Sequence, residues 1–207
     1  MKILLATNNR NKGEEIISIW GERDNIEFLF PSDLGLKFSV IEDGATFPEN
    51  AYKKAILGLK LSGLPTIGED SGLLVDYLKG EPGVKSNRFA GEKASFEANI
   101  KKVLEKLKGV PRDKRKACFV CVICFALSFK KVLFFEGKCF GSIAHYPKGK
   151  EGFGYDPIFI PRGFKKTFAE LGGEVKNKIS HRKEAVMKLK EYLEEMLGRK
   201  NERDKTG

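Results

Sequence analysis

An unbroken apolar run in the second half of the chain constrains the fold more than any other feature. Residues Ala117 to Leu127 (ACFVCVICFAL) are β-branched, aromatic or small, without Gly or Pro, which is typical of a buried strand. A second strand pattern, Lys131 to Ile143, follows after only three residues, 128–130. A connection this tight predicts an antiparallel pair. The apolar run is far shorter than the roughly 20 residues that cross a bilayer, so we expect no membrane span.

Three cysteines within this run raise the question of a metal site. Cys118, Cys121 and Cys124 repeat at CxxCxxC spacing, with Cys139 farther on, and such spacing occurs in zinc and iron–sulfur sites. Because side chains alternate along a strand, however, Cys118 and Cys124 would face one side and Cys121 the other. One metal ion could not bind all three, and we predict reduced thiols packed in the core.

The remaining segments alternate between strand and helix patterns, which predicts an α/β fold in one domain over residues 1–197. Strands are expected at Lys2 to Thr7 and Ile26 to Phe30. Pro65 to Gly68 leads into a further strand at Leu73 to Tyr77, with an interruption at residues 69–72. Helices are expected at 12–20, from Thr46, after Ser95 and after Ser180. The segment 198–207 has no apolar residue and is expected to fray. The apolar stretch Ile3 to Ala6 is too short for a signal-peptide core, so we expect a cytoplasmic protein.

Three of the expected helices have recognisable signals. Thr46 is a suitable N-cap, and Glu49 can complete a capping box, a role we favour over metal binding for this residue. Helical spacing predicts buried faces at Tyr52, Ala55, Ile56 and Leu59, then at Phe96, Ile100, Val103, Leu104 and Leu107, and last at Val186, Leu189, Leu193, Met196 and Leu197.

The chain is strongly basic, with 207 residues and a formal net charge of +10. Such a balance suits nucleic acid or a phosphorylated small molecule. The cations are spread along the chain, and the densest stretch, Lys108 to Lys116, reads as a solvated turn around Pro111. The aromatic-rich segment Phe119 to Phe135 lacks the pattern of an RNA-binding sheet. We therefore expect no stable nucleic-acid partner. A nucleic-acid-binding module is the less favoured alternative.

Two polar clusters in the first half could bind phosphate and metal. Residues 7–12 (TNNRNK) stand between the first strand and the first helix, where free backbone N–H groups suit phosphate; an ordinary turn with an Asn cap explains them equally well. The acidic residues Glu42, Asp43, Glu69 and Asp70 could bring carboxylates together for Mg²⁺. Solvated acidic turns are the alternative, weakest for Asp70, which directly precedes an apolar run.

Two further clusters lie in the second half. In GFGYDP (152–157), the glycines permit sharp turns that expose Phe153 and Tyr155 for stacking on a planar base, although a rigid loop without a ligand would look similar. In KNKISHRK (176–183), Ser180 can cap the last helix and place His181 and Arg182 beside free N–H groups. A lone His there is usually a surface residue, but Lys176, His181 and Arg182 together favour binding of an anion or a base carbonyl.

These clusters, in this order, resemble the inosine/xanthosine triphosphate pyrophosphatases, which remove non-canonical purine nucleotides. The resemblance rests on TNNRNK, TFPENA (46–51), EDSGL (69–73), PGVKSNRFAG (82–91), GFGYDP and ISHR (179–182), and it runs from about Met1 to Leu197. Thr7 and Glu69 are mild departures, since other residues are frequent there in the family. The family fold is an elongated mixed β-sheet flanked by helices, with two lobes around a nucleotide-binding cleft, usually in a homodimer.

The resemblance implies Mg²⁺-dependent hydrolysis of ITP, dITP and XTP to the nucleoside monophosphate and pyrophosphate. It assigns the metal to Glu42 and Asp70, with Asp70 also the proton acceptor that activates water. The residues implied to bind substrate are Thr7, Asn8, Asn9, Arg10, Asn11, Lys12, Ser71, Phe153, Gly154, Tyr155, Asp156, Lys176, His181 and Arg182. If Arg182 faced the base carbonyl, a 6-oxo purine would be preferred over adenine. A related enzyme for modified pyrimidine nucleotides would share this architecture.

Overall fold

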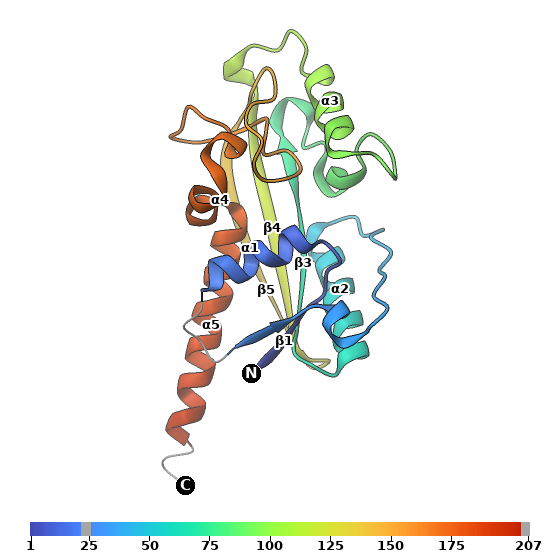
Figure 1. The fold of residues 1–207 in the computed structure, drawn as a ribbon, viewed down its shortest axis with the longest axis vertical. Helices are drawn as coiled ribbons and strands as arrows, with labels where there is room; N and C mark the ends of the chain where they lie inside the picture. Colours follow the sequence, from blue (N-terminus) through green and yellow to red (C-terminus); the bar gives the residue numbers. More distant parts are fainter. Residues whose placement is uncertain (22–25, 204–207) are drawn as a thin grey trace.

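The computed structural model of the chain describes residues 1–21 and 26–203, in which six strands form one mixed sheet (Figure 1). The strands are β1 (Lys2–Leu5), β2 (Glu27–Leu29), β3 (Thr66–Val75), β4 (Lys116–Ser128), β5 (Lys131–Ile143) and β6 (Phe159–Pro161). Their order is β2-β1-β3-β4-β5-β6. The β2-β1-β3 part is parallel, and every later pairing is antiparallel. The predicted α/β class and antiparallel hairpin are therefore confirmed.

Five α-helices are present in the described residues: α1 (Arg10–Trp20), α2 (Phe47–Ser62), α3 (Phe96–Lys106), α4 (Phe168–Ile179) and α5 (His181–Arg203). The sequence patterns missed α4, because two adjacent glycines interrupt it and Gly172 leaves the helical conformation with φ 80°. Helix α5 continues to Arg203, into the segment that was expected to fray, and residues 204–207 lie outside the described residues.

The two faces of the sheet are covered by different helices. On one face, Ala51, Ala55 and Leu59 of α2 pack against alternate residues of β4, among them Cys118 and Cys124. On the other face, α1 and α5 cover a cluster that includes Cys121. All four cysteines are buried and free. The prediction of core thiols on opposite faces of one strand is thus confirmed.

The long hairpin of β4 and β5 runs through both lobes of the elongated molecule, and α5 extends beyond it at one end (Figure 1). Helices α3 and α4 surround a third apolar cluster at one end of the sheet, and β1, β2 and α2 lie toward the other end (Figure 1). These two lobes meet beside the middle of β3, which is where the predicted site residues converge.

Several sequence expectations were wrong in detail. Residues 69–72 do not interrupt a strand, because β3 is continuous through them. Tyr52 is exposed rather than buried and stacks on Phe134 of β5, and Phe96 is also exposed. Arg115, within the stretch read as a solvated turn, is buried and donates to the carbonyls of Ile143, Leu107 and Ala144.

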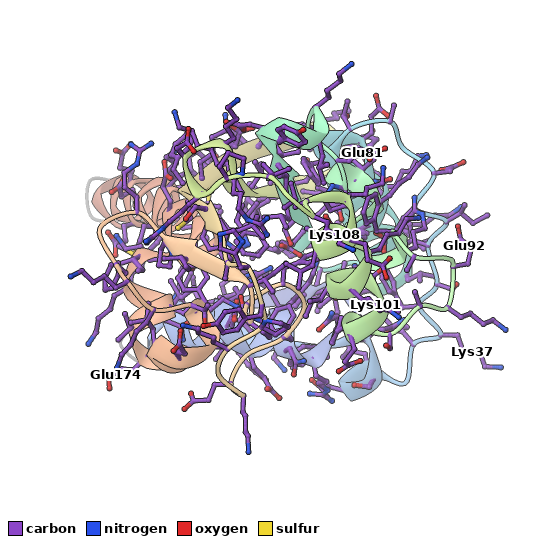
Figure 2. All side chains as sticks on the ribbon, turned by 90° about the horizontal axis from the view of Figure 1, so that it is seen from above. Lys37, Glu81, Glu92, Lys101, Lys108 and Glu174 are labelled. Atoms are coloured by element: carbon purple, nitrogen blue, oxygen red, sulfur yellow. The ribbon has the colours of Figure 1, made fainter. Side chains whose placement is uncertain are left out.

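Charged side chains such as Lys37, Glu92 and Glu174 project from the rim of the molecule (Figure 2). In the part of the chain that the structure describes, no helix is both long and apolar enough to cross a membrane.

Candidate active site

The site is built on β3, where Glu69 and Asp70 point to opposite faces of the sheet. Strand alternation requires this, because adjacent residues of a strand project to opposite sides. Asp70 lies opposite Val122 of β4, on the face covered by α2, and Glu69 lies opposite Ile123, on the face covered by α5. Strand β1 pairs with β3 only at Thr66 and Ile67, so that the edge of β3 from Gly68 onward is free of β1.

On the α2 face, Asp70 and Glu42 converge on the ammonium group of Lys54. Lys54 Nζ lies 3.2 Å from Asp70 Oδ1 and 2.9 Å from Glu42 Oε2, and it also donates to the Glu69 carbonyl at 3.1 Å. Asp70 and Lys54 are both buried. Burial raises the pKa of Asp70, and it outweighs the opposing effect of Lys54 and Lys12.

Asn50 joins the two carboxylate-bearing segments. Its Nδ2 donates to Asp70 Oδ2 at 3.2 Å, and its Oδ1 accepts from the Gly44 amide at 2.8 Å. Arg88 holds the same loop by donating from Nη2 to the Glu42 carbonyl at 2.7 Å. The loop that carries Glu42 is therefore tied to the strand that carries Asp70.

The donor set at this place fits a hard divalent cation. No group of three or more His, Cys, Asp or Glu residues suited to a metal exists among the described residues. Mg²⁺, however, is commonly bound by one or two carboxylates together with water and substrate phosphate oxygens. The Glu42 and Asp70 carboxylates already converge on one positive charge, that of Lys54, which shows that this position suits a cation.

On the opposite face, Glu69 is buried between Lys12 and Arg182. Its carboxylate lies 2.8 Å from Lys12 Nζ and 2.9 Å from Arg182 Nη2. Burial alone would raise the pKa of Glu69, but Lys12 and Arg182 hold it well below its usual range. Burial likewise opposes the charged form of Lys12, and Glu69 and Asp70 reverse that effect and raise its pKa. Glu69 is therefore the permanent counter-charge of two cations.

The ion pairs continue from Arg182 toward the GFGYDP loop. Arg182 Nη1 also pairs with Glu15 of α1, whose other oxygen lies 2.8 Å from Lys176 Nζ. Lys176 in turn donates to Asp156 Oδ2 at 2.5 Å. We call the resulting series the ion ladder; its alternating members are Lys12, Glu69, Arg182, Glu15, Lys176 and Asp156. Three cations and three carboxylates join the start of α1 to the GFGYDP loop.

One narrow cleft, with a cavity volume of about 40 Å³, collects most of the predicted substrate residues. The predicted residues that line it are Lys12, Ser71, Phe153, Gly154, Tyr155, Asp156, Lys176, His181 and Arg182. Residues that the sequence reasoning did not assign to the site also line it: Gly72, Ser86, Asn87, Phe96, Asn99 and Phe119. Charged members of the ion ladder and aromatic side chains therefore both line the cleft.

His181 forms part of that aromatic side. Its ring stacks on Phe119 with centroids 4.7 Å apart and planes at 12°, and its Nδ1 is buried without a hydrogen-bond partner in the described structure. Burial, with Arg182 and Lys176 nearby, holds the pKa of His181 well below its usual range. The neutral ring therefore offers one free nitrogen beside the cleft. Phe153 lies on the same side, with Lys176 Nζ 4.5 Å from its ring centroid.

The other residues of the TNNRNK cluster do not line this cleft. Asn9 caps α1 by accepting from the Lys12 amide at 3.2 Å, as the turn-and-cap interpretation predicted. Asn8 donates to the Phe38 carbonyl, Arg10 donates to Ser32, and Thr7 accepts from the Asn9 amide. Asn11 is exposed. Of the six residues, only Lys12 is directed to the cleft.

Three side chains differ from their expected roles. Tyr155 is buried rather than exposed, because its hydroxyl donates to the Ser86 carbonyl at 2.9 Å. Arg182 does not present its terminal nitrogens freely to a base, because they bind Glu15, Glu69 and Ser71. Only its Nε is without a partner in the described structure. The capping role of Glu49 is modified too, since its carboxylate accepts from Ala45 rather than from Thr46.

The sequence reasoning missed Lys54, Glu15 and Asn50. Lys54 and Asn50 stand one helical turn apart on α2 and directly follow the cap that was identified, so helical spacing was an available signal. Glu15 carried no such signal, because only the packing of α1 against α4 and α5 brings it to Lys176 and Arg182.

The Ham1 family model matches residues 3–192 of the chain. A protein named dITP/XTP pyrophosphatase from Thermoanaerobacter pseudethanolicus is 48% identical over 97% of this chain and 100% of its own length. Another of the same name from Clostridium perfringens is 44% identical over 95% and 98%. The solved Staphylococcus aureus Ham1 protein superposes with a TM-score of 0.84 at 40% identity, covering 95% of this chain and 100% of that one. A HAM1 protein from Coxiella burnetii gives a TM-score of 0.85 at 38% identity, covering 94% and 99%. Sequence and fold agree over nearly the whole chain, which therefore belongs to the Ham1 family.

Proposed function

We propose that this protein hydrolyses non-canonical purine nucleoside triphosphates, ITP, dITP and XTP, to the monophosphate and pyrophosphate. The observation that carries the proposal is the pair of neighbouring polar groups on β3. The Asp70 and Glu42 carboxylates converge on Lys54, and Lys12, whose pKa Asp70 helps to raise, lines a cleft with Phe153 and His181. The printed name of the relatives, dITP/XTP pyrophosphatase, supports the same substrate class.

The proposed cofactor is Mg²⁺, held by Glu42 and Asp70. When bound, it supplies charge neutralisation and in-line alignment to the phosphate chain, the main requirements of phosphoryl transfer. Asn50 and Arg88 position the two ligands, because their hydrogen bonds fix Asp70 and the Glu42 loop relative to each other.

Asp70 accepts the proton of the attacking water in this proposal. Its raised pKa suits that task, because a carboxylate that is less stable in its charged form is a stronger base. Lys12 and Lys54 bind phosphate oxygens as the negative charge shifts toward the pyrophosphate leaving group. Ser71 lines the cleft, and its Oγ accepts from Arg182 Nη2 at 3.1 Å. Thr7 to Asn11 bind the phosphate chain through the backbone at the start of α1, because free N–H groups at a helix N-terminus attract anions.

The base lies in the cleft between Phe153 and the His181 ring. Gly154 leaves room beside Phe153, and the Nδ1 of His181 and the Nε of Arg182 are the free polar atoms that a purine can satisfy. Tyr155 and Asp156 line the cleft and support their neighbours, Tyr155 through its bond to the Ser86 carbonyl and Asp156 through its bond to Lys176. Discrimination against adenine follows if these donors and acceptors pair with a 6-oxo purine and are left unpaired by a 6-amino group.

The first test is pyrophosphate release from ITP, XTP, dITP, ATP, GTP and dUTP, each with Mg²⁺ and with EDTA, at mildly alkaline pH. We expect metal-dependent release that strongly favours ITP, dITP and XTP. Preference for dUTP would instead identify a pyrimidine nucleotide enzyme. Release from none of the six by folded protein would contradict the proposal, and a salt-dependent shift of labelled RNA or DNA would then support the nucleic-acid alternative.

The catalytic role of Asp70 has its own test. Asp70→Asn removes the proton acceptor and should lower kcat by about 10²- to 10⁴-fold, the usual contribution of general base catalysis. Asp76→Asn, at an exposed carboxylate just after the same strand, is the matched control and should keep wild-type turnover. Circular dichroism establishes that both variants fold. Wild-type kcat in Asp70→Asn would assign the base to another residue.

We also propose that the protein acts in the cytoplasm and as a homodimer. The free buried thiols suit a reducing compartment. The homodimer is supported by the resemblance described above and by exposed aromatic side chains on the sheet.

A further inference from the structure

A second hollow lies against a different face of α3 from the cleft. Its volume is about 700 Å³, which is within the usual range for small-molecule sites. One wall consists of α3 and the turn after it, with Ile100, Leu104 and Leu107, and the other belongs to residues 145–157, with Pro147 and Pro157. We call this second wall the 145–157 loop and the space between the walls the α3 hollow. Its walls can hold an apolar body of nucleoside size.

The buried guanidinium of Arg115 lies at the end of the α3 hollow where α3 stops. Arg115 is 2% exposed and contributes to the lining. Its Nη1 donates to the Leu107 carbonyl at 2.8 Å, and its Nε and Nη2 donate to the carbonyls of Ile143 and Ala144 at 2.9 and 2.8 Å. One side chain therefore ties the end of α3 to the start of the 145–157 loop.

The charge of Arg115 is not balanced by a carboxylate. In the part of the chain that the structure describes, its partners are three carbonyl groups, which carry partial charges only. Burial lowers the pKa of Arg115, and no neighbouring carboxylate opposes that effect. Arg182, by contrast, has Glu69 and Glu15 beside it, and they raise its pKa. Because buried charges are usually paired, an anion in the α3 hollow would supply the partner that Arg115 lacks.

The rim of the α3 hollow carries further positive charge. Lys101 and Lys108 are exposed and stand along α3 and just beyond its end (Figure 2). The carboxylates of the lining are Glu97 and Glu105, and Glu105 lies 3.9 Å from Lys101. Together with Arg115, three cations face two carboxylates across apolar walls. This lining suits an organic anion with an apolar body and one carboxylate, sulfonate or phosphate group.

The α3 hollow and the cleft share both of their walls. On α3, Phe96 lines the cleft and Leu104 lines the hollow; on the other wall, Phe153 lines the cleft and Pro157 lines the hollow. The rings of Phe96 and Phe153 contact each other with centroids 6.4 Å apart, at the end of α3 opposite Arg115. A molecule between the walls therefore acts on the ring contact that borders the cleft.

We propose that the α3 hollow is a second small-molecule site, which binds an organic anion with an apolar body. The charged group meets Arg115, Lys101 and Lys108, and the body lies against Ile100 and Leu104. The bound molecule shifts α3 against the 145–157 loop and thereby changes the affinity of the cleft for its substrate. Only this last step rests on the function proposed above.

Two fluorescent probes with nearly the same apolar body test the charge recognition. Anilinonaphthalene sulfonate carries a negative charge, and phenylnaphthylamine carries none. The double variant Lys101→Glu with Lys108→Glu should bind the sulfonate probe about tenfold more weakly, because two contacts change from attraction to repulsion, and it should bind the neutral probe as the wild type does. Lys93→Glu with Lys178→Glu is the matched control, since both lysines are exposed and outside the lining. A wild type that binds no sulfonate probe, or a double variant that binds it equally well, would overturn the proposal.

The apolar wall has its own variant. Leu104→Asn keeps the size of a partly buried side chain but makes it polar, so it should weaken the binding of both probes severalfold. Leu61→Asn, at a leucine of α2 that is 41% exposed and outside the lining, should leave both affinities unchanged. Circular dichroism checks that each variant folds. Wild-type affinity of Leu104→Asn for both probes would place them elsewhere and contradict the site.

Steady-state hydrolysis of ITP with and without saturating sulfonate probe tests the effect on the cleft. We expect KM to change about fivefold or more, a usual size for coupling between two sites. We expect kcat to stay the same, because Asp70, Glu42 and Lys54 do not belong to the walls of the α3 hollow. The Lys101 and Lys108 double variant should keep its own KM at the same probe concentration. An unchanged KM in the wild type would refute the coupling, whereas protein that binds the probe but hydrolyses no nucleotide would contradict the proposed function alone.

Discussion

At the scale of single residues, the neighbours Glu69 and Asp70 show how environment divides two carboxylates between different tasks. Both are buried, but Glu69 has Lys12 and Arg182 as direct partners and its pKa lies well below the usual range. Asp70 has Lys54 as its ion-pair partner, and burial raises its pKa. The strand pleat that turns them to opposite faces therefore gives one carboxylate a permanent charge and leaves the other able to accept a proton.

His181 makes the free energy of unfolding depend on pH. Its pKa is well below 6.5 in the folded protein because of burial and the nearby cations, and it is about 6.5 in an unfolded chain. Above pH 6.5 the ring is neutral in both states. Below pH 6.5 the imidazole binds a proton in the unfolded chain but not in the folded protein. As the pH decreases, we therefore expect the free energy of unfolding to decrease by up to about 1.4 kcal/mol per pH unit.

Urea unfolding between pH 7.5 and 5.5 measures this dependence. His181→Asn should lose this part of the slope, whatever its effect on absolute stability, because Asn does not titrate. His145→Gln, at the exposed second histidine, should retain it. An unchanged slope in His181→Asn would assign the pH dependence to other groups.

At the scale of elements, two glycines set how closely the helices approach the strands. A Cβ at Gly137 of β5 would lie 2.1 Å from the His181 carbonyl at the start of α5. A Cβ at Gly68 of β3 would lie 2.1 Å from the Ala51 carbonyl of α2. Neither contact is possible without moving a helix. Because α5 begins with His181 and Arg182, and α2 carries Lys54, these contacts fix the site as well as the fold.

Gly137→Ala tests this coupling. It should displace the start of α5, lower stability by about 1–3 kcal/mol as for other overpacked positions, and raise KM for ITP. Gly173→Ala in α4 is the matched control, since a Cβ there meets no atom within 4 Å, and it should be neutral or slightly stabilising. Thermal melting and steady-state kinetics measure both effects. Equal behaviour of the two variants would show that α5 tolerates the displacement.

The same scale explains what could be predicted from the sequence. The long hairpin and the caps at Thr46 and Ser95 depend on local pattern, and they are confirmed. Helix α4 was missed because its glycines oppose helix locally, and only packing against α1 and α5 offsets that cost. Motif order identified nine residues of one cleft. Glu15 was out of reach, since its partners Lys176 and Arg182 are distant in sequence and meet it only in the folded molecule.

At the scale of the whole molecule, the net charge of +10 is a property of the surface more than of the site. The ion ladder is balanced, with three cations and three carboxylates. The excess cations are spread over the chain, and their field reaches about a Debye length into solution. A polyanionic substrate is therefore attracted before it contacts the cleft.

Ionic strength should consequently affect capture more than turnover. Raising KCl from about 0.05 to 0.5 M shortens the Debye length severalfold and should lower kcat/KM for ITP severalfold while changing kcat little. Steady-state kinetics with Mg²⁺ held in excess measures this, with sucrose at matched osmolality as the control. A kcat/KM that is insensitive to salt would confine the electrostatic attraction to the cleft.

The packing of α5 against the edge of β5 also bears on how such a chain avoids fibril formation. Its most aggregation-prone segment, Ala117 to Leu127, lies in β4 and is paired on both sides by β3 and β5. Strand β5 is next in line, and Glu184 and Lys188 occupy its backbone groups at the centre of that edge. Helix α5 therefore does more than complete the core and present His181 and Arg182. It also blocks the template on which further strands could add, so that a very apolar hairpin can persist at high protein concentration.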